Sequence, residues 1–353
     1  MKTSKLAVSK ETGIAWGTVD KIFKRVSKRI EPDKICRYKN LRYIGIDEVS
    51  YKVGHSYLTV ILNHETNEVV DVAIGHSQEV LDSMFEKIPE DSRSNIEVVS
   101  GDGAKWIRAS MKNYLPNAKF CIDPFHVVEW TNECLKKVRI SESREAKLEL
   151  KYLQNEKKEL LKEIEKCKKD GATPKYNQLN NSLNVLNTAI DRMKENIDAI
   201  NGGLYPLCKN PEHLTEKQTE KLNCILKEFP NLKKAYNRKE ELRDILKLDD
   251  VQQAEVELKA WERRAKNSNL EPFVYLSEKI SRHHNNIKNT IKYGVTNARI
   301  EAKNNNIKGI IRCGRGFRNI DNLMGLVEFN GTIKLNSLIT NSGYGNWRKA
   351  TLL

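Results

Sequence analysis

The chain has 353 residues, of which 39% are hydrophobic and 31% charged, and its formal net charge is +14. That length predicts two or three domains instead of a single compact core. The sequence has no run of the roughly eighteen consecutive apolar residues that cross a bilayer and no apolar N-terminal secretory segment. Composition therefore argues against a membrane-spanning or secreted protein, and a cytoplasmic location without membrane partners is expected.

The cysteines are scattered singly, and none forms a CxxC pair. An odd number of isolated cysteines favours reduced thiols over a disulfide framework. A structural zinc site needs closely spaced ligands, so no zinc is expected. The seven cysteines are Cys36, Cys121, Cys134, Cys167, Cys208, Cys224 and Cys313.

The positive charge is concentrated in two segments. Residues 1–40 hold eleven Lys and Arg against four Asp and Glu, and residues 292–318 hold seven against one. Such a density of charge attracts the phosphate backbone of nucleic acid and releases its counterions. On charge alone, a generally basic protein without a nucleic-acid partner is the alternative.

The first thirty residues predict two short helices, around Leu6–Thr12 and Trp16–Val26, with Gly13 turning the chain between them. This arrangement is typical of a helix-turn-helix, whose second helix commonly enters the major groove of DNA. Any basic helical hairpin would share the pattern. Three residues of the second helix are candidate DNA contacts: Lys21, Lys24 and Arg25.

From Arg42 onward the pattern changes to strands, with three segments that suggest an antiparallel series. Helices and further strands then alternate. This order predicts an α/β fold, with a mixed sheet covered by helices. The expected strands are Tyr43–Asp47, Tyr57–Leu62, Val69–Ile74, Ile96–Val99 and Lys119–Ile122, and the expected helices are Val80–Ile88 and Ala104–Tyr114.

Two heptad stripes of apolar residues, joined by a turn at residues 170–174, predict an antiparallel coiled-coil hairpin over residues 144–200. Its role is open, since it could contact DNA, a second subunit or nothing. Thr215 with Gln218 resembles a capping box that opens a further helix. A last helix is expected across Asn297–Ile311.

Asp47 and Asp102 stand at the ends of apolar strands, in IGID and VVSGD, and Glu301 is a lone acid among basic residues. Carboxylates held rigidly by one sheet bind hard divalent cations. A pair of Mg²⁺ ions can activate a water or a 3′-hydroxyl for phosphodiester displacement. For each aspartate taken singly, a turn or helix cap is the alternative. The basic residues near Glu301, candidate DNA contacts, are Arg299, Lys303, Lys308, Arg312, Arg315 and Arg318.

Several motifs occur together along the chain, among them IGIDEVSYKVGHSYLTVILNHETNEVVDV, VVSGDGAKWIRASMKNYLPNAKFCIDPFHVV and TNARIEAKNNNIKGIIRCGRGFRN. In this order they resemble the ISL3 insertion-sequence family of DDE transposases, over about residues 10–325. The resemblance implies a ribonuclease-H-like catalytic domain interrupted by a large all-helical insertion. It also implies a transposase that cleaves and joins DNA with Mg²⁺ or Mn²⁺. Such an enzyme acts on terminal inverted repeats and target DNA, as a homo-oligomer.

Carried over by motif, the resemblance implies that the catalytic and metal-binding acids are Asp47, Asp102 and Glu301. The DPFHV segment resembles an Asp-x-x-His motif, which implies supporting roles for Asp123 and His126. Glu48 follows Asp47 directly. Because side chains alternate along a strand, Glu48 is expected on the opposite face.

The chain also departs from the family pattern. No cysteine cluster forms the zinc ribbon that usually precedes the helix-turn-helix, and Ala302-Lys303 stands where Gly-Leu is usual. One alternative is therefore a catalytically inactive, N-terminally shortened remnant that only binds DNA. Another is a ribonuclease-H-like nuclease without strand transfer.

The expected organisation combines these interpretations. A short, possibly truncated helix-turn-helix precedes a catalytic domain in two parts, with the helical insertion between them. The segments are 1–38 for the helix-turn-helix, 39–140 for the first catalytic part, 141–280 for the insertion, 281–330 for the final catalytic helix and 331–353 for an irregular tail.

Overall fold

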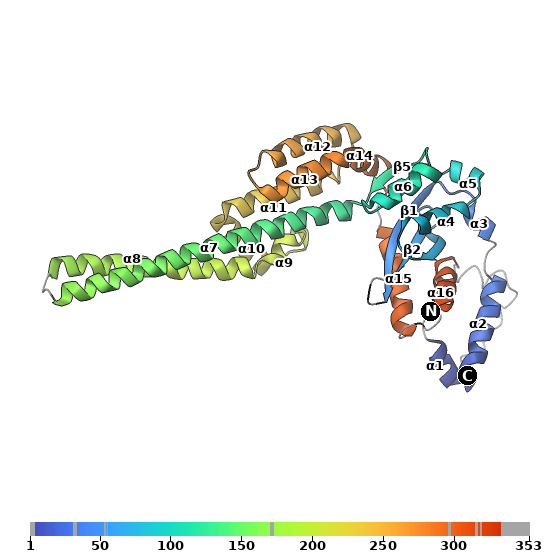
Figure 1. The fold of residues 1–353 in the computed structure, drawn as a ribbon, viewed down its shortest axis with the longest axis horizontal. Coiled ribbons are helices and arrows are strands. Elements are labelled where there is room, and N and C mark those ends of the chain that lie inside the picture. The colour runs from blue at the N-terminus through green and yellow to red at the C-terminus, as the bar shows by residue number, and fades with distance from the viewer. Residues whose placement is uncertain are drawn as a thin grey trace. The chain divides into compact units, whose positions relative to one another are not determined.

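The structure is a computed structural model that describes residues 4–30, 34–52, 54, 56–169, 173–295, 298–314, 317 and 320–332. The chain divides into two compact units. The first comprises residues 1–126 and 285–353 and contains the sheet, and the second comprises residues 127–284 and is helical (Figure 1). The fold class predicted from the sequence, a mixed α/β domain of the ribonuclease-H-like kind with a helical insertion, is confirmed.

The first unit is built on a five-stranded sheet with the order β3-β2-β1-β4-β5. The first three strands pair antiparallel in series, whereas β4 runs parallel to β1 and β5 runs parallel to β4. The strands are β1 (Tyr43–Lys52), β2 (Ser56–Asn63), β3 (Glu68–Ile74), β4 (Val98–Gly101) and β5 (Lys119–Ile122).

Helices of this unit pack on the sheet and on one another. The described ones are α1 (Lys5–Thr12), α2 (Trp16–Ile30), α3 (Lys34–Tyr38), α4 (Gln78–Glu86), α5 (Glu90–Ser94), α6 (Lys105–Tyr114), α14 (His284–Tyr293), α15 (Ala298–Gly314) and α16 (Ile320–Thr332). Helix α15 lies against β1, α16 lies against β3, and α4 contacts both β3 and α6. Alternate residues of β1 and β2, such as Val49 and Val60, form a buried core with Ile300, Ile307 and Leu323.

Strand β1 is longer than the sequence predicted. It continues past Asp47 to Lys52 because β2 pairs with it antiparallel along its whole length. Its parallel pairing with β4, in contrast, extends only as far as Gly45 opposite Ser100. Asp47 therefore lies inside β1, just beyond the point where the parallel partner ends.

Helix α16 lies almost wholly within residues 281–330, expected as the final catalytic helix region, although no separate helix was predicted there and an irregular tail was expected only from residue 331. Its apolar residues Leu323, Leu326 and Val327 are buried, so tertiary packing outweighs its weak local propensity. The tail predicted for residues 331–353 lies, beyond Thr332, outside the described residues.

The two N-terminal helices form as predicted. Gly13 ends α1 in the left-handed conformation, with φ at 68°, which a residue without a Cβ adopts at no steric cost. Ser4 caps the start of α1 by accepting a hydrogen bond from the Ala7 N–H. The Asp20 carboxylate on α2 pairs with Lys5 on α1 at 2.6 Å and with Lys24 on its own helix at 3.1 Å.

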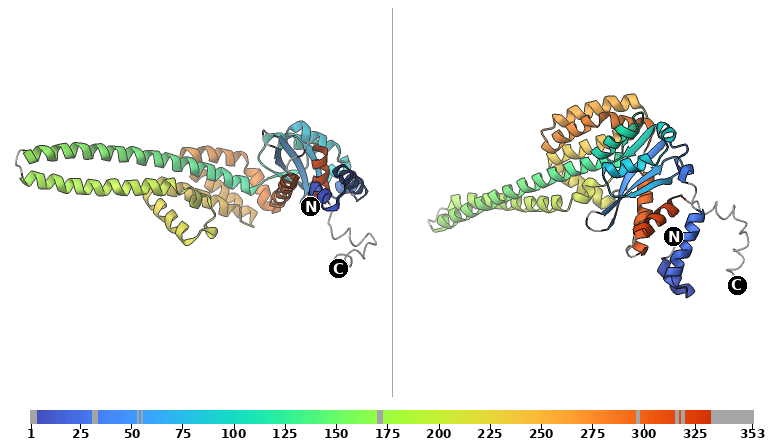
Figure 2. Two further views of the ribbon diagram at one scale, coloured as in Figure 1. Left: turned by 90° about the horizontal axis from the view of Figure 1, so that it is seen from below. Right: turned by 45° about the vertical axis from the view of Figure 1, so that its right-hand side comes forward.

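The second unit is a set of helices in which two long ones run side by side (Figure 2). They are the arms of the predicted hairpin. The helices are α7 (Pro124–Lys169), α8 (Thr173–Asn201), α9 (Leu204–Cys208), α10 (Glu216–Glu228), α11 (Pro230–Ile245), α12 (Val251–Lys266) and α13 (Glu271–Arg282), with a 3₁₀ turn at Pro211–His213. Among the described helices of the whole chain, none combines the length and apolarity required of a membrane span.

The first arm of the hairpin begins earlier than expected, at Pro124. A proline in the first helical turn loses no hydrogen bond, and the Asp123 carboxylate accepts one from the Phe125 N–H at 3.3 Å. Asp123 and Pro124 thus supply an N-cap and a first-turn proline, the two features typical of a helix N-terminus. Helix α7 therefore has 46 residues, about 69 Å at 1.5 Å per residue.

The heptad positions explain how the helices of this unit pack. Ile164 on α7 and Ile190 and Ile197 on α8 are buried, as the apolar stripes predicted. The capping box of Thr215 and Gln218 at the start of α10 is also confirmed. Periodicity and capping are local properties, so these features could be predicted without any knowledge of the tertiary structure.

Candidate active site

Asp47 is the centre of a polar group on β1. Its Oδ1 accepts a hydrogen bond from the Glu48 N–H at 2.8 Å. Its Oδ2 accepts one from the Asn304 side-chain amide, on α15, at 2.6 Å. A half-buried carboxylate is thus held from two directions, once by its own strand and once by the helix that covers the strand.

The strand register brings two further aspartates level with Asp47. Gly45 on β1 lies opposite Ser100 on β4, and Ser100 lies opposite Cys121 on β5. The candidate aspartates each follow these paired residues by two positions. Neighbouring strands lie about 4.8 Å apart, so the three carboxyl groups are close neighbours. From β1 to β5 they are Asp47, Asp102 and Asp123.

The electrostatics agree with this placement. Burial raises the pKa of Asp47, and the carboxylates of Asp102 and Asp123 raise it further. The Glu48 N–H and His126 act in the opposite sense, since both stabilise the ionised form. A carboxylate that is buried beside other carboxylates is poised to gain stability from a bound cation.

Asp102 and Asp123 also accept hydrogen bonds from backbone N–H groups near the starts of α6 and α7. The Oδ1 of Asp102 accepts a hydrogen bond from the Ala104 N–H at 2.9 Å, directly before α6. Asp123 caps α7 and accepts the His126 N–H through its backbone carbonyl at 3.1 Å. A carboxylate has two oxygens with several lone pairs, so capping and cation binding are compatible.

Glu301 lies in the first turn of α15 and is exposed. The residues of α15 that face the core are Ile300, Asn304 and Ile307, which are 0%, 4% and 3% exposed. Within the described residues, no group of three or more His, Cys, Asp and Glu side chains is arranged to hold a metal ion. The structure thus brings Asp47 and Asp102 together and leaves Glu301 on the solvent side of its helix.

A hard divalent cation fits the groups that do converge. Asp47 and Asp102 supply carboxylate oxygens, which such cations prefer. Beside them, the Oδ1 of Asn304 is buried and has no hydrogen-bond partner in the described structure. A buried oxygen without a partner costs free energy, and an amide oxygen is an ordinary ligand of Mg²⁺-type ions.

A second cluster next to Asp47 could not be predicted as a unit. His64, after β2, reaches over Gly45 to the Ser100 hydroxyl, with 2.7 Å between Nε2 and Oγ. A Cβ on Gly45 would lie 2.6 Å from that Nε2 and would also strike Ile300. Burial, together with Arg299, lowers the pKa of His64 to about 4. In the sequence, only Gly45 within IGID indicated that another group, here His64, approaches the strand closely.

The predicted DNA contacts differ in their surroundings. Lys303 is half-buried, and burial lowers its pKa. Arg299 is exposed as a residue, yet its guanidinium donates a hydrogen bond to the His64 carbonyl oxygen. Two of the predicted contacts, Arg315 and Arg318, lie outside the described residues. Those that are exposed are Lys21, Lys24 and Arg25 on α2, and Lys308 and Arg312 on α15.

The chain is similar to transposases along most of its length. A family model described as a transposase, of the DDE type and the ISL3 group, matches residues 44–327. Transposases for insertion sequence element IS1557 from two strains of Mycobacterium tuberculosis are each 34% identical over 325 residues, 92% of this chain and 67% of the relative. A transposase for insertion sequence element IS1001 from Bordetella parapertussis is 29% identical over 143 residues, 39% of this chain and 34% of the relative.

Proposed function

Because this chain belongs to the ISL3 family of DDE transposases, we propose that it cuts DNA at the ends of an insertion sequence and joins the freed 3′ ends to target DNA. The proposed site holds divalent cations, Mg²⁺ or Mn²⁺, with Asp47, Asp102 and Glu301. When bound, such ions lower the pKa of a water or 3′-hydroxyl and stabilise the leaving oxygen of the phosphodiester.

The observation that supports this proposal best is the hydrogen bond between Asn304 and Asp47. It holds α15 on β1 at the level where β4 ends, directly before Asp102. Glu301 stands three residues before Asn304, and side chains three apart on a helix are neighbours, with about 5–6 Å between their Cβ atoms. Glu301 is therefore within one helical turn of a residue that touches Asp47.

The exposed position of Glu301 has an electrostatic reason. Asp102 and Asp123 already raise the pKa of Asp47, so a fourth carboxylate among them would cost free energy in the absence of positive charge. We propose that Glu301 turns toward Asp47 and Asp102 once cation and DNA are bound.

The remaining residues serve orientation and DNA binding in this proposal. Asp123 and His126 hold the start of α7 beside Asp47, and His126 stabilises the ionised carboxylate. Exposed basic residues of α2 and α15 neutralise DNA phosphates, a sequence-independent contribution that falls with salt. Since an element has two ends, at least two copies of the chain are expected to act together.

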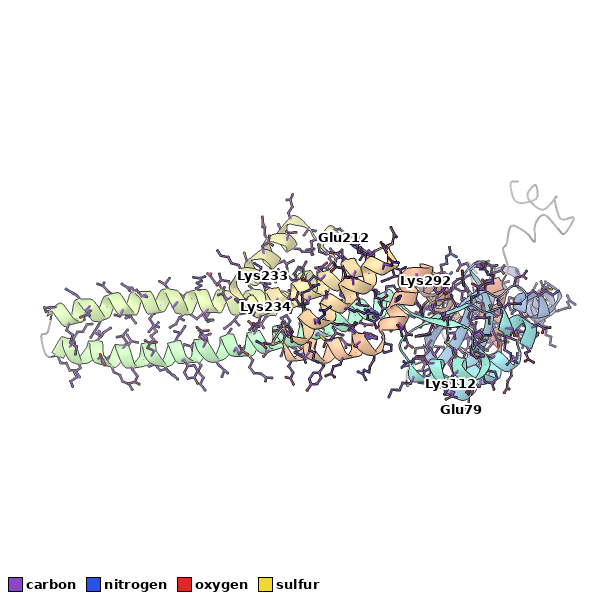
Figure 3. The ribbon with its side chains drawn as sticks, turned by 90° about the horizontal axis from the view of Figure 1, so that it is seen from above. Glu79, Lys112, Glu212, Lys233, Lys234 and Lys292 are labelled. Carbon is purple, nitrogen blue, oxygen red and sulfur yellow. The ribbon has the colours of Figure 1, made fainter. Side chains whose placement is uncertain are left out.

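Strand cleavage tests the proposal directly. The full chain is incubated with DNA that carries the element's own terminal repeats, with and without Mg²⁺, and nicked and joined products are resolved on a gel. Asp102→Asn and Glu301→Gln are expected to lower the cleavage rate about a thousandfold or more, because several kcal/mol of transition-state stabilisation are lost. Glu79→Gln is the matched control, since Glu79 is an exposed acid on α4 (Figure 3).

Each product pattern has a distinct meaning. Equal cleavage by Asp102→Asn and the parent would show that the acids are assigned wrongly. Cleaved but never joined DNA would identify a nuclease without strand transfer. Specific binding of the terminal repeats without any cleavage would identify an inactive remnant that binds DNA.

A further inference from the structure

Three asparagines follow one another on α15, and only the first is buried. Asn304 is 4% exposed, whereas Asn305 and Asn306 are exposed. Asn304 interrupts an otherwise apolar stripe between Ile300 and Ile307, which pack into the core under the sheet. A buried amide costs free energy unless its hydrogen bonds are satisfied, so this position needs a specific explanation.

The amide nitrogen of Asn304 has a partner and its oxygen has none. The Nδ2 donates to Asp47 Oδ2 at 2.6 Å, opposite the Glu48 N–H that donates to Oδ1 at 2.8 Å. Together these two donors fix the plane of the Asp47 carboxylate. The Oδ1 of Asn304 is buried without a hydrogen-bond partner in the described structure.

A purely structural role explains this arrangement poorly. A leucine would complete the apolar stripe of α15 and would remove the amide oxygen that lacks a partner in the described structure, a defect that costs roughly 1–3 kcal/mol, although Asp47 Oδ2 would lose its donor. A leucine also has a better helix propensity than an asparagine. The amide is therefore maintained at the expense of stability, as is common for residues that serve a site.

We infer that Asn304 is a positioning residue of the cation site, which orients Asp47 through its amide N–H. The missing partner of its oxygen is the cation or a water molecule on that cation. This inference rests on the proposed function, because it requires that Asp47 binds a divalent cation.

Mn²⁺ binding to the full chain, without DNA, tests the inference. Free Mn²⁺ is measured by electron paramagnetic resonance during titration, and the melting temperature is measured on the same samples. Asn304→Leu is expected to weaken Mn²⁺ binding about 10- to 100-fold, the usual effect of removing a residue that orients a metal ligand. Its melting temperature without metal should be unchanged or higher. Asn305→Leu, on the exposed side of the same helix, should match the parent in both measurements.

The opposite pattern, a lower melting temperature with parental Mn²⁺ affinity, would show that Asn304 only packs α15 onto β1. If Asn304→Leu does not fold, Asn304→Ala removes the amide without added branches and should show the same loss of affinity. Asp47→Asn separates the two proposals. If it loses Mn²⁺ binding while both Asn304 variants keep it, only the inference is wrong. If Asp47→Asn binds like the parent, or the parent binds no Mn²⁺, the proposed cation site fails and the inference with it.

Discussion

Each of the two units has its own internal contacts, and these differ in how far apart the contacting residues lie in the sequence. In the helical unit, Arg139 on α7 donates to the Ile200 carbonyl, 61 positions away, and Trp261 donates to the Arg238 carbonyl, 23 positions away. In the sheet unit, the contact that defines the candidate site joins Asn304 to Asp47 across 257 positions. Contacts within the described residues of the helical unit thus span up to 138 positions, as between Cys134 and the Pro272 carbonyl oxygen, whereas the contact that defines the site joins segments still further apart in sequence.

The two units also differ in how many residues share the same structural role. Along the hairpin, several buried residues repeat the same kind of apolar contact, so each carries a share of the stability. Around Asp47, each role belongs to one residue, such as Gly45 for close approach and Asn304 for orientation. Substitutions in the helical unit should therefore change stability alone, whereas those near β1 should change stability and cation binding together.

The largest effect on stability is expected for Lys239→Met in the helical unit. Lys239 is 1% exposed, and its Nζ lies 2.9 Å from the Leu207 carbonyl oxygen and 2.6 Å from Glu240 Oε1. Methionine keeps the bulk but leaves these buried acceptors without a cation. The free energy of unfolding in urea, followed by circular dichroism, should fall by about 3–5 kcal/mol.

Lys259→Met provides the matched control. Lys259 pairs with Glu255 at 2.9 Å on the exposed surface of α12, so its loss should cost less than about 1 kcal/mol. Mn²⁺ affinity should be unchanged in both lysine variants. A loss of affinity in Lys239→Met would contradict the separation between the two units.

Gly45→Ala should have the next largest effect. The added methyl group would lie 2.6 Å from His64 Nε2 and would also strike the Ile300 side chain, so the packing of these two side chains between β1 and α15 must shift. Overpacking of this kind costs about 1–3 kcal/mol, and the shift should weaken Mn²⁺ binding as well. Thermal unfolding and the Mn²⁺ titration measure both consequences.

Gly309→Ala, on the same helix α15, is the control for this pair. Among the described residues, no atom beyond its chain neighbours and its own helix backbone lies within 4 Å of the position that its Cβ would take, so the substitution should stabilise the helix by about 0.5–1 kcal/mol. If both alanine variants destabilise the protein equally, the close approach at Gly45 is not what limits the packing of α15.

The smallest of the three effects depends on pH and involves His64. Burial lowers its folded-state pKa to about 4 from 6.5, so between these values the unfolded chain binds more protons. The stability that neutral His64 provides is complete above about pH 6.5 and is lost progressively as the pH falls toward 4. Between pH 7 and pH 5 the loss is about 2 kcal/mol. Glutamine does not titrate in this range, so the free energy of unfolding of His64→Gln, measured in urea, should fall less between pH 7 and pH 5 than that of the parent. Identical losses in the variant and the parent would exclude His64 as the source of the pH dependence.

The sequence by itself determined the features that are local. Helix periodicity predicted the hairpin, alternation predicted the strands, and Thr215 with Gln218 predicted a cap, because each pattern reflects the backbone conformation of adjacent residues. Motif resemblance singled out Asp47 and Asp102, which the structure places next to each other. The start of α7 could also have been predicted from Asp123-Pro124, a local signal that the heptad pattern obscured.

Only the tertiary structure decided which distant residues meet. Parallel pairing of β1 with β4 and of β4 with β5 brought Asp123 level with Asp47, and no local pattern specifies which strands become neighbours. The docking of α15 selected Asn304 from a run of three asparagines and left Glu301 exposed. Such choices depend on the packing of segments hundreds of residues apart, where a rotation of one helix by a single residue would present a different side chain to the site.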